Sequence, residues 1–138
     1  MAPADVVVLS ARDPAEAADI ADLRAGTLAA LEVLGPDELG ARGLRAAGAR
    51  AAQRLGAGGR PFWIHLDLDV LDERAMPATD YLMPDGLLWD ELAALLRPLG
   101  ASPGLAGLSL GCLNPDKDPG GSFTERTCAL LAGALSAR

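Results

Sequence analysis

Hydrophobic positions along the chain fall into three short runs, which are separated by longer stretches rich in Ala and Leu. The runs cover residues 6–9, 62–70 and 105–113. The first run is continuously apolar, a pattern typical of a strand covered on both faces in a parallel sheet. Strands that alternate with helical segments indicate βαβ units. The pattern therefore predicts an α/β fold around a mostly parallel sheet.

Helix signals occupy much of the chain between these runs. Asp13 is a good cap for a first helix, Gly43 and Gly48 weaken a second one, and Pro98 is expected to end a third. Residues 27–33 fit either a short strand or a helix. The predicted helices are residues 15–25, 36–55, 89–96 and 124–135.

Composition predicts a single globular domain over residues 1–138. The chain is 50% hydrophobic, and it contains no internal repeat or low-complexity linker. No apolar run approaches the roughly 20 residues of a membrane-spanning helix, and no basic segment of a secretory signal opens the chain. A net charge of −7 argues against nucleic-acid and membrane partners. Because there are only two cysteines, a reducing, cytoplasmic setting is expected.

Two carboxylates at the end of the second strand carry the clearest chemical signal. Side chains alternate along a strand, so His65, Asp67 and Asp69 are expected on one face. Two buried carboxylates repel each other, and a divalent cation removes that cost because hard cations prefer oxygen ligands. Sites in parallel α/β sheets gather at the carboxyl ends of the strands. A metal site and a pair of loop-capping carboxylates are both compatible with the spacing alone.

Other families also place Asp-x-Asp at a strand end. Haloacid-dehalogenase-like phosphatases use it as nucleophile and acid/base, but their motif opens the chain and continues with Thr or Val where Leu71 stands here. Nucleotide-sugar transferases bind a metal with it, but nothing else in this sequence supports a sugar-nucleotide site. Both families match this sequence through the Asp-x-Asp motif alone, so a family that also matches the neighbouring residues is preferred.

The surrounding residues resemble one family. Residues 65–72, His-Leu-Asp-Leu-Asp-Val-Leu-Asp, resemble the second metal motif of the arginase/agmatinase/formimidoylglutamase family, the ureohydrolases. Residues 113–119 resemble that family's Asn-Pro-Asp-x-Asp-Pro segment, and residues 8–13 resemble its strand ending in Gly-x-Arg-Asp. Residues 77–82 and 85–87 resemble an altered form of its glycine-rich loop. The motifs occur in the family's order and cover nearly the whole chain.

The resemblance implies a three-layer α/β/α arginase-like fold and a metal-dependent hydrolase. The family cleaves an amidino C–N bond of guanidino or formimino compounds with a binuclear centre, usually manganese. By position, Asp67 and Asp69 match metal ligands, and Asp72 matches a third Asp that we interpret as structural. The resemblance thus implies a small guanidino compound as substrate.

Several family residues have no counterpart here. The family's His ligands and its Asp-x-His-x-Asp cluster are missing, and the only histidine, His65, is expected to be a strand hydrogen-bonder. Cys112 replaces the family's Glu before Asn-Pro and is expected to be a buried thiol. The chain therefore resembles a C-terminal half with an incomplete Mn²⁺ site, no predicted catalytic residue and no activity alone. It would need an upstream half or self-association, and the alternative is a non-catalytic binding or assembly remnant.

Overall fold

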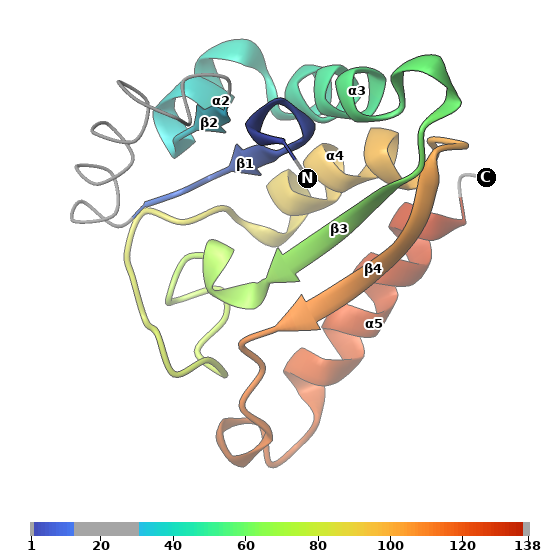
Figure 1. The fold of residues 1–138 in the computed structure, drawn as a ribbon. Helices are drawn as coiled ribbons and strands as arrows, with labels where there is room; N and C mark the ends of the chain where they lie inside the picture. The colour runs from blue at the N-terminus through green and yellow to red at the C-terminus, as the bar shows by residue number, and fades with distance from the viewer. Residues whose placement is uncertain (1, 13–30, 137–138) are drawn as a thin grey trace.

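The structure of the chain is a computed structural model that describes residues 2–12 and 31–136 (Figure 1). The strands are β1 (Val7–Leu9), β2 (Glu32–Leu34), β3 (Phe62–Asp67) and β4 (Leu105–Gly111). The helices are α2 (Pro36–Arg42), α3 (Leu44–Leu55), α4 (Trp89–Gly100) and α5 (Ser122–Leu135). Short 3₁₀ turns cover Pro3–Asp5, Ala57–Gly59, Leu68–Val70 and Pro115–Lys117. None of the described helices is long and apolar enough to cross a membrane.

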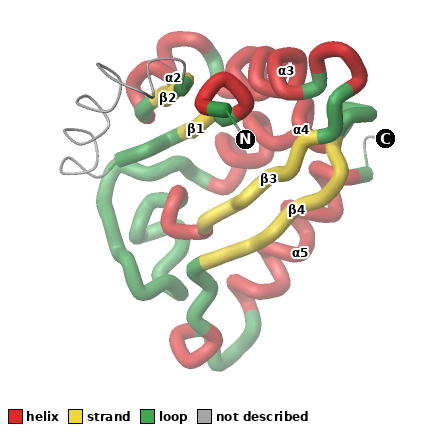
Figure 2. The backbone as a smooth tube through the Cα atoms, in the orientation of Figure 1, coloured by secondary structure: helices red, strands yellow, loops and turns green. Residues whose placement is uncertain are grey.

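The four strands form two parallel pairs. β1 pairs with β2, which places Val8 opposite Val33, and β3 pairs with β4, which places Leu66 opposite Leu110. The strands lie side by side in the order β2, β1, β3, β4, and no described strand lies between β1 and β3 (Figure 2). The predicted α/β class with parallel strands is confirmed.

The hydrophobic core lies between the strands and the helices behind them. In Figure 1, α4 and α5 pack behind β3 and β4. Phe62 and Leu66 of β3 belong to one buried cluster with four leucines of α4: Leu92, Leu95, Leu96 and Leu99. The opposite face of β3 is not covered by any described helix, and Trp63 on that face is 60% exposed.

The predicted second helix is interrupted. Residues 36–55 form α2 and α3 rather than one helix, because Gly43 adopts a φ of 78° that no helical residue takes. Gly48, which was expected to weaken the helix, instead allows α3 to approach α4. A Cβ at Gly48 would lie 2.9 Å from Pro98 Cγ and would clash with the carbonyl oxygen of Leu95.

Other predicted boundaries also differ from the structure. The strand predicted over residues 62–70 ends at Asp67, where a 3₁₀ turn begins, and the strand over 105–113 ends at Gly111. α4 continues through Pro98 to Gly100, because Pro98 lies in the last turn and packs against α3. Of residues 27–33, only the end is described, and it enters β2 at Glu32. The predicted helix over residues 15–25 lies outside the described residues.

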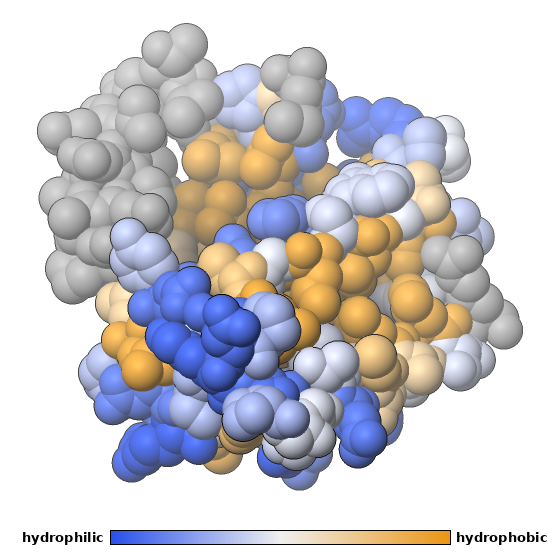
Figure 3. Space-filling model, turned by 90° about the horizontal axis from the view of Figure 1, so that it is seen from below, coloured by the Kyte–Doolittle hydropathy of each residue, from blue (hydrophilic) through white to orange (hydrophobic). Residues whose placement is uncertain are grey.

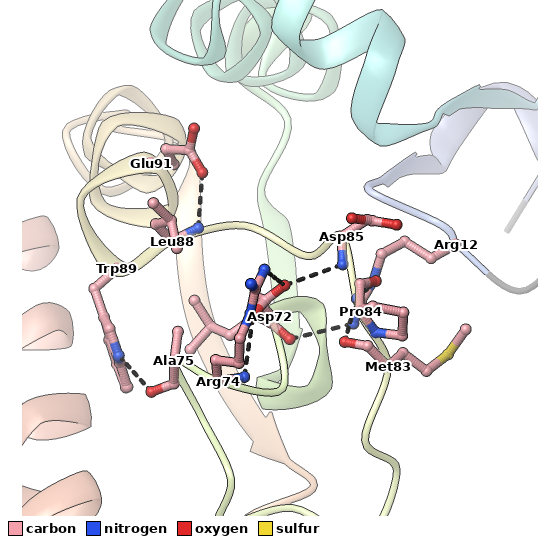
Figure 4. A network of polar contacts seen from close by, with 11 residues as sticks. Arg12, Asp72, Arg74, Ala75, Met83, Pro84, Asp85, Leu88, Trp89 and Glu91 are labelled. Carbon is pink, nitrogen blue, oxygen red and sulfur yellow. Dashed lines mark hydrogen bonds and ion pairs between the residues drawn. The ribbon is translucent and has the colours of Figure 1, made fainter.

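Arg12 connects the two strand pairs at their carboxyl ends. It lies three residues after the end of β1, and its guanidinium donates hydrogen bonds to the carbonyl oxygens of Asp69 and Leu71, just after β3. It also donates to the carbonyl oxygens of Met83 at 3.0 Å and Pro84 at 2.8 Å (Figure 4). A guanidinium is suited to this role because it carries five donors in a rigid plane. One side chain thus fixes β1, the turn after β3 and the following loop relative to one another.

Asp72 organises the same loop from the inside. It is buried, and its carboxylate accepts hydrogen bonds from the backbone N–H groups of Arg74 and Asp85, both at 3.0 Å (Figure 4). The Arg74 guanidinium adds further hydrogen bonds, which lower the pKa of Asp72 to about 2. The structural role predicted for Asp72 agrees with this geometry.

Replacing Gly86 should destabilise the fold. A Cβ at Gly86 would clash with the backbone of Leu71 and Asp72 and would lie 2.7 Å from the Arg12 guanidinium. Gly86→Ala is expected to lower the free energy of unfolding by about 1–3 kcal/mol, the usual cost of overpacking. Urea denaturation followed by circular dichroism measures this change. Gly120→Ala is the control, since a Cβ there meets nothing within 4 Å, and equal losses in both variants would contradict the prediction.

Asp72 should make stability depend on acidic pH. Its folded-state pKa lies below the value of about 3.9 for an unfolded Asp, so its contribution is complete above pH 4 and is lost as pH falls toward 2. Asp72→Asn should therefore be less stable than the parent at pH 6, and the difference should shrink progressively between about pH 4 and 2. Urea denaturation at several pH values tests this. A difference that stays constant across that range would show that the carboxylate charge does not matter.

Candidate metal site at the carboxyl ends of the strands

Asp67 and Asp69 come together where β3 ends. Asp67 is the last residue of β3, and Asp69 lies in the 3₁₀ turn that follows, not on the same strand face as predicted. The turn still brings both carboxylates beside Cys112, which directly follows β4. One ligand atom from each of these residues lies within 4.8 Å of the others. Two neighbouring strand ends thus supply a cluster of two carboxylates and one thiol.

The electrostatics of this cluster favour a positive charge. Partial burial raises the pKa of Asp69, and the charge of Asp67 raises it further, whereas Arg12 lowers it. The raised pKa of Asp69 is the effect expected where a carboxylate is partly buried beside another negative charge. A cation held between them would relieve this repulsion.

Cys112 is exposed, so the prediction of a buried thiol was wrong. Its backbone has a φ of 62° at the end of β4, which turns the side chain toward the carboxylates instead of the core. A hydrogen bond with Asp67 raises the pKa of Cys112 to about 12, and burial and the Asp69 charge act in the same direction. The sulfur is therefore a neutral thiol at neutral pH and a poor nucleophile.

His65 lies on the exposed face of β3. Its Nδ1 is 2.8 Å from the Ser109 hydroxyl, and its Nε2 is 3.5 Å from Asp67. The Trp63 indole donates to the same Ser109 hydroxyl at 3.1 Å. The predicted role of His65 as a strand hydrogen-bonder agrees with these contacts, which also orient a group beside Asp67.

The loop that resembles the family's glycine-rich segment is held by the segment after β4. Asn114 donates to Asp80 at 2.7 Å, and its backbone N–H donates to the carbonyl oxygen of Ala78 at 2.8 Å. Lys117 donates to the carbonyl oxygen of Thr79 at 2.7 Å. The two loops therefore form one rim beside the carboxylates.

A cavity of about 1180 Å³ adjoins the cluster. Asp67, Asp69 and Cys112 line it together with residues of β1 and β3. Seen from below, the molecule has a hollow that is bordered by apolar side chains, while hydrophilic side chains cover another part of the same face (Figure 3). The carboxylates therefore face a space large enough for additional groups.

Two residues of this region have roles that were not predicted from the sequence. Ser10 is buried at the end of β1 with a φ of 67°, and its hydroxyl has no hydrogen-bond partner among the described residues. Arg12 is the link between the strand pairs described above. The resemblance of residues 8–13 to the family's Gly-x-Arg-Asp pattern could have identified both residues. In that pattern a glycine, which tolerates the left-handed conformation, stands at the position of Ser10, and an arginine stands at the position of Arg12.

Comparisons with known proteins agree with this geometry. A family model described as the arginase family matches residues 1–137. The chain is also similar to the N(omega)-hydroxy-L-arginine amidinohydrolase of Streptomyces lavendulae, with 41% identity over 58 residues. These residues make up 42% of this chain and 20% of that protein.

Solved structures of this family share the fold. Bacillus caldovelox arginase superposes with a TM-score of 0.82 at 20% identity, covering 100% of this chain and 44% of that one. Proclavaminate amidinohydrolase from Streptomyces clavuligerus superposes with a TM-score of 0.75 at 25% identity, again covering 100% and 44%. The chain thus spans less than half the length of these relatives. Because the family match extends over residues 1–137, the chain belongs to the arginase family.

Proposed function

We propose that this chain supplies part of a ureohydrolase-type metal centre that hydrolyses the amidino C–N bond of a guanidino compound. The convergence of Asp67 and Asp69 at the ends of the strands, open to a large cavity, is the observation that carries the proposal. The amidinohydrolase names of the Streptomyces relatives support this reaction class. We further propose that residues 1–138 act as a single partial domain.

The donor set fits one divalent cation. Asp67 and Asp69 offer carboxylate oxygens, the ligands that Mn²⁺ prefers, and their mutual repulsion favours a cation between them. The Cys112 thiol beside them is protonated and would be a weak ligand for a hard ion. Water molecules would complete the coordination of a single ion.

The same donors do not fit two ions. A pair of cations needs several more carboxylate or imidazole ligands, and among the described residues only His65 lies near enough to be considered. We therefore infer that the complete centre forms only when another part of the fold, from an upstream half or a second copy, faces the cavity. The chain alone would then be inactive.

The chain's own residues have defined tasks in the assembled site. Asp67 and Asp69 would hold the metal, which when bound lowers the pKa of a water molecule and supplies hydroxide. Arg12 fixes the backbone of Asp69, and His65 orients the Asp67 carboxylate. Cys112 presents a neutral thiol toward the cavity, so recognition of a cationic guanidinium must come from other residues.

We also place the protein in a reducing, cytoplasmic setting. Both Cys112 and Cys128 are free and exposed, and exposed thiols persist where the surroundings keep them reduced. A non-catalytic remnant would have no need for two facing carboxylates, and it becomes the preferred reading if no metal binds.

Metal binding can be measured on the chain itself. Mn²⁺ should broaden NMR signals near Asp67 and Asp69 with a dissociation constant of about 0.1–1 mM, typical of a site with few charged ligands. Replacing both with Asn should weaken binding at least roughly tenfold, since the charges that attract the ion are gone. The control is Asp37→Asn with Asp90→Asn, which removes the same charge from two exposed helix starts. Equal broadening in the Asp67/Asp69 double variant would place the metal elsewhere.

Catalysis should be absent from the isolated chain. With excess Mn²⁺ and arginine or agmatine, urea release is expected to stay at the background rate, because a second metal has too few ligands. A colorimetric urea assay tests this. Turnover that is clearly above background and is abolished by Asp67→Asn would show that the described residues already form a working centre.

A further inference from the structure

The side chain of Cys112 lies beside both carboxylates of the candidate site. Its thiol is hydrogen-bonded to Asp67 and to Asp69. Gly111, the last residue of β4, gives Asp67 the room to lie over the end of that strand, since a Cβ at Gly111 would clash with the Asp67 carboxylate. The fold thus brings the Cys112 sulfur and one oxygen of each carboxylate within 4.8 Å of one another.

We propose that Asp67, Asp69 and the Cys112 sulfur form a mononuclear site for a thiophilic divalent ion, such as Zn²⁺, with Cys112 bound as a thiolate. The proposal deepens the proposed function, on which it rests for the two carboxylate ligands, by naming the class of ion that this donor set selects. On binding, the ion takes the place of the thiol hydrogen, which passes to water as a proton. No electron is transferred.

The donor set matches the coordination that Zn²⁺ prefers. Zn²⁺ binds both thiolate and carboxylate, and its catalytic sites use three protein ligands with water in the fourth position. Asp67, Asp69 and Cys112 supply the three ligands, and the cavity that they line leaves a fourth position open. Mn²⁺ prefers six oxygen ligands and would leave the sulfur unused. The residues present therefore suit one thiophilic ion better than the pair of manganese ions that the family uses.

The present separations are close to those of a four-coordinate site. With metal–sulfur and metal–oxygen distances of about 2.3 and 2.1 Å, the ligand atoms of a tetrahedral site lie about 3.5 Å apart. The three atoms here therefore need to approach by roughly 1 Å at most. Side-chain rotation can provide this movement, because the Asp67 side chain is 44% exposed and Cys112 is also exposed.

The charges around the site balance when a divalent ion is bound. Two carboxylates and a thiolate carry three negative charges, which match the two positive charges of the ion and the one of Arg12, whose guanidinium acts on Asp69. In the metal-free chain, the hydrogen bond with Asp67, burial and the carboxylate charges raise the pKa of Cys112 to about 12. A cation replaces the shared hydrogen and neutralises those charges, and a thiol that coordinates a metal ion loses its proton.

The Ser10 hydroxyl is an independent indication that this cavity holds a polar ligand. Ser10 is only 5% exposed, and its hydroxyl has no hydrogen-bond partner among the described residues. The residue lines the same cavity as Asp67, Asp69 and Cys112. A buried hydroxyl without a partner is unfavourable, and water that a bound ion holds in the cavity would supply one.

Cobalt absorption tests the proposal on the intact chain. Co²⁺ substitutes for Zn²⁺, and a thiolate bound to it gives a charge-transfer band in the near ultraviolet. One Co²⁺ per chain should produce this band, and Zn²⁺ should remove it by displacement. Cys112→Ser should lose the band and bind Co²⁺ at least roughly tenfold more weakly, since loss of even an outer-shell partner costs that much. Its Mn²⁺ affinity should stay within about threefold of the parent, because Mn²⁺ does not use the sulfur.

Cys128→Ser is the matched control, since Cys128 is also a free, exposed thiol, and this variant should keep the band. A band that persists in Cys112→Ser, disappears in Cys128→Ser or requires two chains per ion would overturn the proposal. Binding of Co²⁺ and Mn²⁺ without a sulfur band would overturn it and leave the carboxylate site of the proposed function intact. A sulfur band retained in the variant with both Asp67→Asn and Asp69→Asn, or no binding of any ion, would overturn both.

Discussion

The hydrogen bonds of Arg12 to the carbonyl oxygens after β3 are the constraint on which the rest of the site depends. β1 and β3 are not neighbours in a ladder, so no backbone hydrogen bond sets their spacing. One guanidinium replaces that ladder at the carboxyl ends, by binding the turn that carries Asp69 and the loop that returns to α4. Gly86 gives this arginine its room. The position of the Asp69 backbone relative to β1 follows from this contact.

The cluster of Asp67, Asp69 and Cys112 is consistent with half of a metal centre. Its carboxylates repel each other, its thiol stays protonated, and its open side is a cavity and not a packed core. A self-sufficient site would be expected to surround such charges with ligands or donors. The proposal of an incomplete centre addresses this deficit, which is a pair of carboxylates with few other ligands or donors around them among the described residues.

The sequence was sufficient for the fold class, the family and the meeting of Asp67 with Asp69, because hydrophobic patterning and local motifs encode these features. It was insufficient for features that depend on tertiary contacts or on the local backbone conformation. Pro98 was expected to end a helix, yet packing against Gly48 allows α4 to continue. Cys112 was expected in the core, yet the backbone conformation at the end of β4 turns it outward. The contacts of Arg12 link residues that are 57 to 72 positions apart, which no local pattern can reveal.

The most direct test of the central role of Arg12 is amide hydrogen exchange in Arg12→Met. Val8 and Ser10, whose N–H groups face β2, should exchange at least roughly tenfold faster than in the parent, because β1 loses its connection to the turn after β3. Exchange at the amides of β3 that face β4 should be unaffected. In the control Arg45→Met, which replaces an exposed arginine in α3, exchange at Val8, Ser10 and the β3 amides should all be unchanged. Unchanged exchange at Val8 and Ser10 in Arg12→Met would contradict the account.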